Sequence, residues 1–183
     1  YRQANKFAGD GSGRCSAGMG VEEGLRSTQA HEELIEVLGE VEKLATLNGL
    51  TLELSRMYQI RSSVYFFRGE TEACIEASQA SLECAREAGS IEMEARSLST
   101  LGDAASNSGK MLSADHYFNE CLQIARQQEF ANLIAVNLAM RASGSFWKNE
   151  IASSITDCRE EIERARYIRD LLAELIALTI GGM

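Results

Sequence analysis

The sequence predicts an all-α protein, a right-handed α–α superhelix in which antiparallel helix pairs repeat about every 40 residues. Three observations support this fold class. The 183 residues include no proline, a residue that would interrupt helices. Apolar residues recur at helical spacing, as at Leu34, Leu38 and Val41. Glycine, which readily takes the left-handed conformation that ends a helix, recurs at even spacing at positions 49, 69, 89 and 109.

The period of the repeat fixes where each element should lie. The segments 84–86, 124–126 and 164–166 share an Ala-Arg dipeptide at this offset, and Asn149 continues the glycine series. Helices are expected at His31–Asn48, Thr51–Arg68, Glu70–Ala88, Ile91–Ser108, Met111–Gln128, Ala131–Lys148, Glu150–Ile168 and Asp170–Ile180. The repeat domain, residues 31–183, therefore divides into a half-pair 31–49, pairs 50–89, 90–129 and 130–168, and a partial helix 169–183.

Residues 1–30 differ in composition, because six glycines lie among polar residues between positions 9 and 24. A phosphate-binding loop would need the pattern GxxxxGK[ST] or GxGxxG after a strand, and neither context is present. We expect a flexible lead or linker. The chain begins at Tyr1 and stops just after an apolar stretch, as expected of a fragment of a longer protein.

Charge and cysteine content narrow the function classes. The net charge of −9 disfavours nucleic-acid binding and adsorption to anionic membranes. No apolar run approaches the ~20 residues of a membrane span. Five scattered cysteines without a CxxC pair are typical of reduced thiols in a cytoplasmic protein. Neither a metal site nor a cofactor is expected.

Catalysis is not expected either. The chain has two histidines, His31 and His116, and neither lies in a pattern that pairs a base with a nucleophile. Adjacent glutamates on a helix point in different directions and fit a solvated face. The recurring arginines Arg86, Arg126 and Arg166 could form a basic ladder, but helix-end placement or pairing with a glutamate of an adjacent repeat explains them better.

The middle pair resembles the tetratricopeptide repeat (TPR). The TPR pattern consists of a large apolar residue, a Leu-Gly dipeptide, a hairpin glycine, an alanine, an aromatic residue and a small residue. In this pair the corresponding residues are, in order, Leu98, Leu101 with Gly102, Gly109, Ala114, Phe118 and Cys121. Gly102 and Ala114 should lie where helices approach closely, and Phe118 should fill a hollow beside the neighbouring pair.

In a TPR solenoid the first helix of each pair lines a concave groove that binds partners. Counted from the Leu-Gly dipeptide, the positions that line the groove should be mostly polar, with aromatic residues at one end of the groove. The candidate partner-binding residues are Arg56, Gln59, Ser63, Phe67, Arg96, Ser99, Asp103, Asn107, Ser143 and Trp147. Asp103 would oppose an anion, which disfavours a receptor for a peptide carboxyl terminus.

The stretch Val64–Met140 resembles a more particular group. The segments 86–90, 92–96 and 101–104 are similar to the C-terminal helical repeats of bacterial signalling proteins that join a class III adenylate/guanylate cyclase domain, a STAND-type ATPase module and a TPR tail. This resemblance implies a regulatory tail. No cyclase aspartates or Walker lysine are present, so no activity is implied for this chain.

These observations predict a non-catalytic interaction or sensor module of a larger signalling protein that binds a protein or peptide in the groove. Two alternatives remain open: a homo-oligomerisation module that forms, for example, a homodimer, and a small-molecule-sensing regulatory domain.

Overall fold

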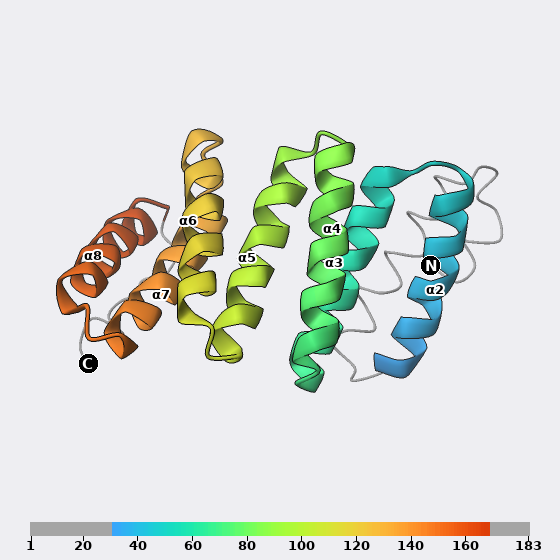
Figure 1. The fold of residues 1–183 in the computed structure, drawn as a ribbon. Helices are drawn as coiled ribbons and strands as arrows, with labels where there is room; N and C mark the ends of the chain where they lie inside the picture. Colours follow the sequence, from blue (N-terminus) through green and yellow to red (C-terminus); the bar gives the residue numbers. More distant parts are fainter. Residues whose placement is uncertain (1–30, 169–183) are drawn as a thin grey trace. The chain divides into compact units, whose positions relative to one another are not determined.

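Seven α-helices make up residues 31–168, the part of the chain that the computed structural model describes (Figure 1). The side chains at 146, 147, 151, 161, 164, 165, 167 and 168 are outside this description. The helices are α2 (His31–Leu47), α3 (Thr51–Arg68), α4 (Thr71–Glu87), α5 (Ile91–Asn107), α6 (Met111–Gln127), α7 (Ala131–Trp147) and α8 (Ile151–Ile168). Residues 31–168 contain no strand, and the predicted all-α fold class is confirmed.

The helix ends agree with the sequence-based bounds to within one residue. Five of the expected helices extend one residue too far at the C-terminus, because that residue belongs to the turn. The helix expected at Asp170–Ile180 and the lead 1–30 lie outside the described residues, so the domain division stays a prediction.

One turn geometry recurs at even spacing along the chain. A residue with a positive φ lies one or two positions after each helix end: Gly49, Gly69, Gly89, Gly109, Glu129 and Asn149. The next residue donates its backbone N–H to the carbonyl five positions earlier; Glu70 N and Tyr65 O, for example, are 2.9 Å apart. These bonds satisfy carbonyls that a helix end leaves without a partner. A tight reversal therefore follows every helix from α2 to α7.

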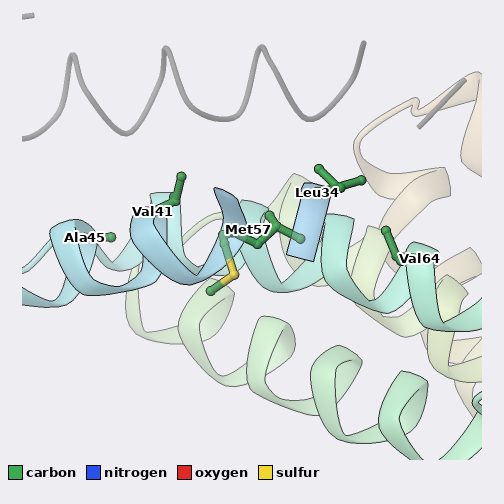
Figure 2. Packing of buried hydrophobic residues seen from close by; sticks show 6 residues of the cluster. Leu34, Val41, Ala45, Met57 and Val64 are labelled. Atoms are coloured by element: carbon green, nitrogen blue, oxygen red, sulfur yellow. The ribbon is translucent and has the colours of Figure 1, made fainter. Parts of the chain in front are cut away.

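The chain divides into two compact units between Ser97 and Leu98, inside α5. In unit 1, whose described part is residues 31–97, the core lies between α2 and α3 (Figure 2). Leu34, Leu38 and Val41 of α2 meet Met57 and Val64 of α3, and all five are buried. Each such side chain stabilises the fold by about 1.5–3 kcal/mol relative to an exposed one.

In unit 2, whose described part is residues 98–168, α5 and α6 approach closely at Gly102. A Cβ atom at this position would lie within 2.9 Å of three ring atoms of Phe118. Phe118 is buried and also clusters with Ala105, Ala114 and the partly buried Met140 of α7. The roles predicted for Gly102 and Phe118 are confirmed.

The two positions that hold Gly102 and Phe118 recur in the other helix pairs. They are occupied by Ser62 and Ser78 in α3 and α4, and by Ala142 and Cys158 in α7 and α8, all of them buried. A small residue on the first helix thus recurs in every pair, and only the middle pair combines glycine with a large aromatic ring. The register is constant while the side-chain volumes change.

Candidate partner-binding surfaces

Four of the predicted groove residues lie on one face of α3 in unit 1. Arg56, Gln59, Ser63 and Phe67 are three or four positions apart, which is the spacing of one helix face. Phe67 is 70% exposed, and its ring makes an edge-to-face contact with Phe66 at 5.9 Å. A large exposed aromatic side chain contributes little to the core, so it is available for binding.

Arg56 and Arg96, two arginines of unit 1, occupy equivalent positions of successive repeats. Arg56 is exposed and lies 3.9 Å from Glu53, while Arg96 Nε donates to Glu92 at 3.0 Å. Both arginines are exposed, and an ion pair of an exposed side chain contributes little stability. A partner's carboxylate could replace either glutamate at low cost.

The predicted groove residues of unit 2 occupy three environments. Asn107 is exposed, Ser143 is half-buried and Ser99 is 6% exposed. Ser99 Oγ accepts a hydrogen bond from Asn137 Nδ2 at 3.0 Å, so this hydroxyl belongs to the interior. The side chain of Trp147 lies outside the described residues. The assignment of the ten residues to a binding groove stays a prediction.

Asp103 is a partly buried carboxyl group on α5. Its Oδ1 atom is buried and has no hydrogen-bond donor among the described residues. Burial raises the pKa of Asp103 to about 7, because the charged form loses hydration. Near neutral pH this carboxyl group is therefore present in both its charged and its neutral form.

Sequence reasoning missed a charged cleft of about 480 Å³ in unit 2, bounded by α6, α7 and α8. Its polar lining includes Asp115, Asn119, Arg141, Lys148, Glu150 and Asp157. Arg141 holds Asp157 through two hydrogen bonds of 2.7 and 2.6 Å and reaches Asn119 at 2.5 Å. The hydrogen bond to Asp157 raises the pKa of Arg141 above its ordinary value.

Lys148 completes the charge pairing of this cleft. Its ammonium group contacts Asp115 and lies 2.8 Å from Glu150. A sequence signal for the cleft existed: arginine occupies the same repeat position at Arg61 and Arg141, where the middle pair has Leu101. An arginine at a position that elsewhere faces the core indicates an acidic partner, which for Arg61 is Glu42 at 2.8 Å.

The predicted pairing of the recurring arginines is confirmed for two of them. Arg86 Nε donates to Glu94 at 2.8 Å, and Arg126 holds Glu160 with two bonds of 3.2 and 2.6 Å. Each glutamate belongs to the next helix pair. These arginines therefore connect repeats.

Two further properties concern residues 31–168. No group of three or more His, Cys, Asp or Glu side chains in this range is placed to hold a metal ion. None of the helices in the same range has the length and apolar character needed to cross a membrane. Cys74, Cys84, Cys121 and Cys158 form no disulfide bond within these residues.

No family model matches the sequence, and no curated protein matches it. The fold, however, is similar to a crystal structure from Pyrococcus horikoshii, that of a Signal Transduction ATPase with Numerous Domains (STAND) protein with a tetratricopeptide repeat sensor. The TM-score is 0.83 at 15% sequence identity. This chain has a TPR fold. The match covers 94% of this chain and 27% of that protein, so the chain spans about a quarter of its length. At this identity the likeness concerns the fold.

Proposed function

We propose that this chain is a non-catalytic interaction or sensor module of a larger signalling protein, and that it binds a protein or peptide along the first helices of its pairs. The observation that carries the proposal is the α3 face, which presents the 70% exposed Phe67 and the exposed Arg56 on a TPR fold. Aromatic residues and arginine dominate the energetics of protein interfaces.

The similarity to the sensor of a STAND protein supports the signalling role. The sequence also resembles helical repeats that follow cyclase and ATPase modules. This resemblance supports the role of a regulatory tail that lies after an enzyme in the same protein. Four cysteines that form no disulfide bond within the described residues fit a reducing, cytoplasmic setting.

A peptide library displayed on phage and selected on the whole chain tests this proposal. We expect Phe67→Ala to weaken the selected peptides about tenfold or more, because a central aromatic contact is lost. Trp147→Ala should act in the same direction. Leu112→Ala is the matched control, since Leu112 is 83% exposed on α6, a second helix of its pair. Selection of no peptide, or equal effects of Phe67→Ala and Leu112→Ala, would disprove the proposal.

The cleft between α6, α7 and α8 favours a second candidate function, the sensing of a small molecule. Its volume of about 480 Å³ falls within the size range of small-molecule sites. Its three carboxylates and two cations would suit a polar ligand that carries both charges. A thermal-shift screen of free amino acids checks this, because a ligand of the native state raises the melting temperature. The alternative of homo-oligomerisation is tested by light scattering over a range of protein concentrations.

A further inference from the structure

Each unit has a hollow at the same place of the repeat. The hollow of unit 1 has a volume of about 220 Å³, is open to solvent and is lined by α3 and α4. Its lining consists of Tyr58, Arg61 and Tyr65 from α3, and of Glu76, Ala77 and two further alanines from α4. Residues of the charged cleft of unit 2 lie two repeats after five of these positions: 61, 65, 73, 76 and 77. The two hollows can therefore be compared position by position.

In unit 2 a carboxylate of the protein itself occupies this place. Asp157 accepts a hydrogen bond from Arg141 Nε at 2.7 Å and another from Arg141 Nη2 at 2.6 Å. Two parallel bonds of this kind are a strong and specific way for a carboxylate to hold a guanidinium group. Asp157 is only 5% exposed, so the protein has room for this carboxylate beneath its surface.

In unit 1 the arginine is present and the carboxylate is missing. Arg61 occupies the position of Arg141, whereas Ala77, which is 6% exposed, occupies that of Asp157. Arg61 Nε has no hydrogen-bond acceptor in the described part of the chain, although the same atom of Arg141 has one. Arg61 and Ala77 both line the hollow. The hollow therefore lies beside an arginine that lacks the partner its counterpart has.

Other contacts hold Arg61 in place. Arg61 Nη2 donates to Glu42 Oε2 at 2.8 Å, and the Tyr58 hydroxyl donates to Glu42 Oε1 at 2.6 Å. The guanidinium group also lies over the Tyr58 ring, 5.4 Å from its centroid. Glu42 uses one of the five N–H donors of this group, so a second carboxylate can bond the same arginine. An arginine that is already held in position loses less side-chain freedom on binding.

The middle pair shows that packing alone does not require this arginine. Leu101 occupies the position of Arg61 and is buried. Tyr117 occupies the position of Ala77 and packs against the cluster around Phe118. A leucine and a ring thus occupy this place without any charge.

Size and lining define the chemical class of the ligand. A volume of about 220 Å³ is below the roughly 300–1,000 Å³ of sites for drug-sized ligands, so a small molecule or a single side chain fits better. Three alanines and two tyrosine rings offer apolar contacts. Glu76 is exposed at the hollow and repels any negative charge beyond the one that Arg61 binds.

We infer that the hollow beside Arg61 is a recognition site for one carboxylate group on a short apolar chain, bound as Asp157 is bound by Arg141. A free monocarboxylic acid and the glutamate side chain of a partner both have this chemistry.

This site is separate from the predicted partner-binding groove. Successive residues of a helix are rotated by about 100° around its axis. Arg61 and Tyr65 therefore lie on the side of α3 roughly opposite to Gln59 and Ser63. The inference thus goes beyond the proposed function, and Phe67→Ala should leave carboxylate binding unchanged.

The first test needs no ligand, because Ala77→Asp gives unit 1 the carboxylate of unit 2. We expect its melting temperature to lie about 2–4 °C above that of Ala77→Asn, which has the same size and no charge. The Nε–H NMR signal of Arg61 should move toward that of Arg141, which already bonds a carboxylate. A melting temperature equal to or below that of Ala77→Asn would show that no carboxylate fits beside Arg61, and would overturn the inference.

The second test is an NMR titration of the whole chain with sodium propanoate, with sodium chloride at equal ionic strength as the reference. We expect propanoate to shift the Nε–H signal of Arg61 until it saturates. The signal of Arg141 should stay in place, because Asp157 already occupies that arginine. Ala77→Asp should weaken propanoate binding about tenfold or more, since its own carboxylate competes. Equal shifts with propanoate and chloride, or equal shifts at both arginines, would overturn the inference.

A matched pair of variants tests the role of the rim. Glu76→Gln removes a negative charge from the hollow and should strengthen propanoate binding about threefold. Glu72→Gln removes the same charge from an exposed position of α4 outside the lining, and its effect should be smaller. Equal effects of the two variants would show that propanoate does not bind in this hollow.

Two blocked pentapeptides distinguish the sources of the carboxylate: Ala-Ala-Glu-Ala-Ala and the same peptide with glutamine at its centre. If the glutamate peptide binds at least about tenfold more tightly than propanoate, the site takes a partner's side chain. If propanoate binds as tightly as the glutamate peptide, the site takes a free acid. Equal binding of the glutamate and glutamine peptides at Arg61 would overturn the assignment to a carboxylate.

Discussion

The turns of unit 1 have glycine at the position of positive φ, at Gly49, Gly69 and Gly89, whereas the turns of unit 2 have Gly109, Glu129 and Asn149 there. The backbone is the same in all six turns, with φ between 58° and 73°. The hydrogen bond that closes each turn is also the same, at 2.8–2.9 Å. The repeat is therefore a property of the backbone and its hydrogen bonds, and unit 2 preserves it even where Glu129 and Asn149 replace glycine.

The two units differ in the same way in their interiors. Unit 1 places serines at positions 62, 78, 81 and 97, and unit 2 has Gly102, Phe118, Cys121 and Asn137 at the equivalent positions. In unit 1 the hydroxyl groups of Ser55, Ser81 and Ser97 form a hydrogen-bonded network between α3, α4 and α5, whereas Ser78 Oγ has no partner among the described residues. Unit 2 joins them with one large ring and leaves acceptor oxygens near α5 unbonded within the described residues. The same register therefore accommodates different interior contacts in the two units.

Gly102→Ala should give the largest effect and separate the two units most clearly. Its Cβ would meet three ring atoms of Phe118 within 2.9 Å, and the ring is buried. We expect the free energy of unfolding to fall by about 3 kcal/mol in urea denaturation. The cost should shrink in a Phe118→Leu background, where a double-mutant cycle measures the coupling.

Gly39→Ala in α2 is the matched control for this change. No atom lies within 4 Å of a Cβ added there, so the same substitution should raise the free energy of unfolding by about 0.5–1 kcal/mol. If Gly102→Ala were as harmless as Gly39→Ala, the close approach of α5 and α6 would be disproved.

Asp103→Asn should stabilise the unliganded protein at pH 8. Because the pKa of Asp103 is raised to about 7, folding favours its neutral form, and this contribution is lost as the pH rises through 7. We expect a gain of about 2 kcal/mol at pH 8 and less than half of it at pH 5, measured by urea denaturation at both values. Ser63→Ala, at the equivalent position of unit 1, should show no such difference between pH 5 and pH 8. A gain for Asp103→Asn that is the same at both pH values would show that the carboxyl group is not buried.

Ser81→Ala tests the hydroxyl network of unit 1. The change removes the bonds of the hydroxyl to Ser55 O and Ser97 Oγ, and we expect a loss of about 1–2 kcal/mol in denaturation experiments. Ser81→Cys, which imports the residue of unit 2, should cost a similar amount. Ser78→Ala is the control, because Ser78 Oγ is buried without a partner in the described range, and its removal should be neutral or stabilising. A similar loss for both alanine variants would show that the bonds of Ser81 contribute nothing.

The sequence predicted the helices well because the turn signal is local. Gly49, Gly69, Gly89, Gly109 and Asn149 marked five of the six turns, and only Glu129 gave no signal of its own. The contact of Gly102 with Phe118 was also predictable, since a residue pattern specifies it. The cleft around Arg141 had only an indirect signal, an arginine at a repeat position that holds Leu101 in the middle pair, and its partner Asp157, 16 positions away, is brought to it by packing. Burial of Ser99 was missed for the same reason: its partner Asn137 is 38 positions distant.

Glu129→Gly should give the smallest effect and bring unit 2 closer to unit 1. Glu129 is exposed and has φ of 58°, a conformation that costs a residue with a side chain about 1 kcal/mol and glycine almost nothing. We expect the free energy of unfolding to rise by roughly that amount, less the entropy that glycine adds to the unfolded chain. Glu129→Ala keeps the Cβ and should give no gain, while Asn149→Gly should gain only a few tenths, because asparagine tolerates this conformation. If Glu129→Gly and Glu129→Ala had equal stability, the strain would not reside in the backbone of this turn, and the glycines of unit 1 would be there for another reason.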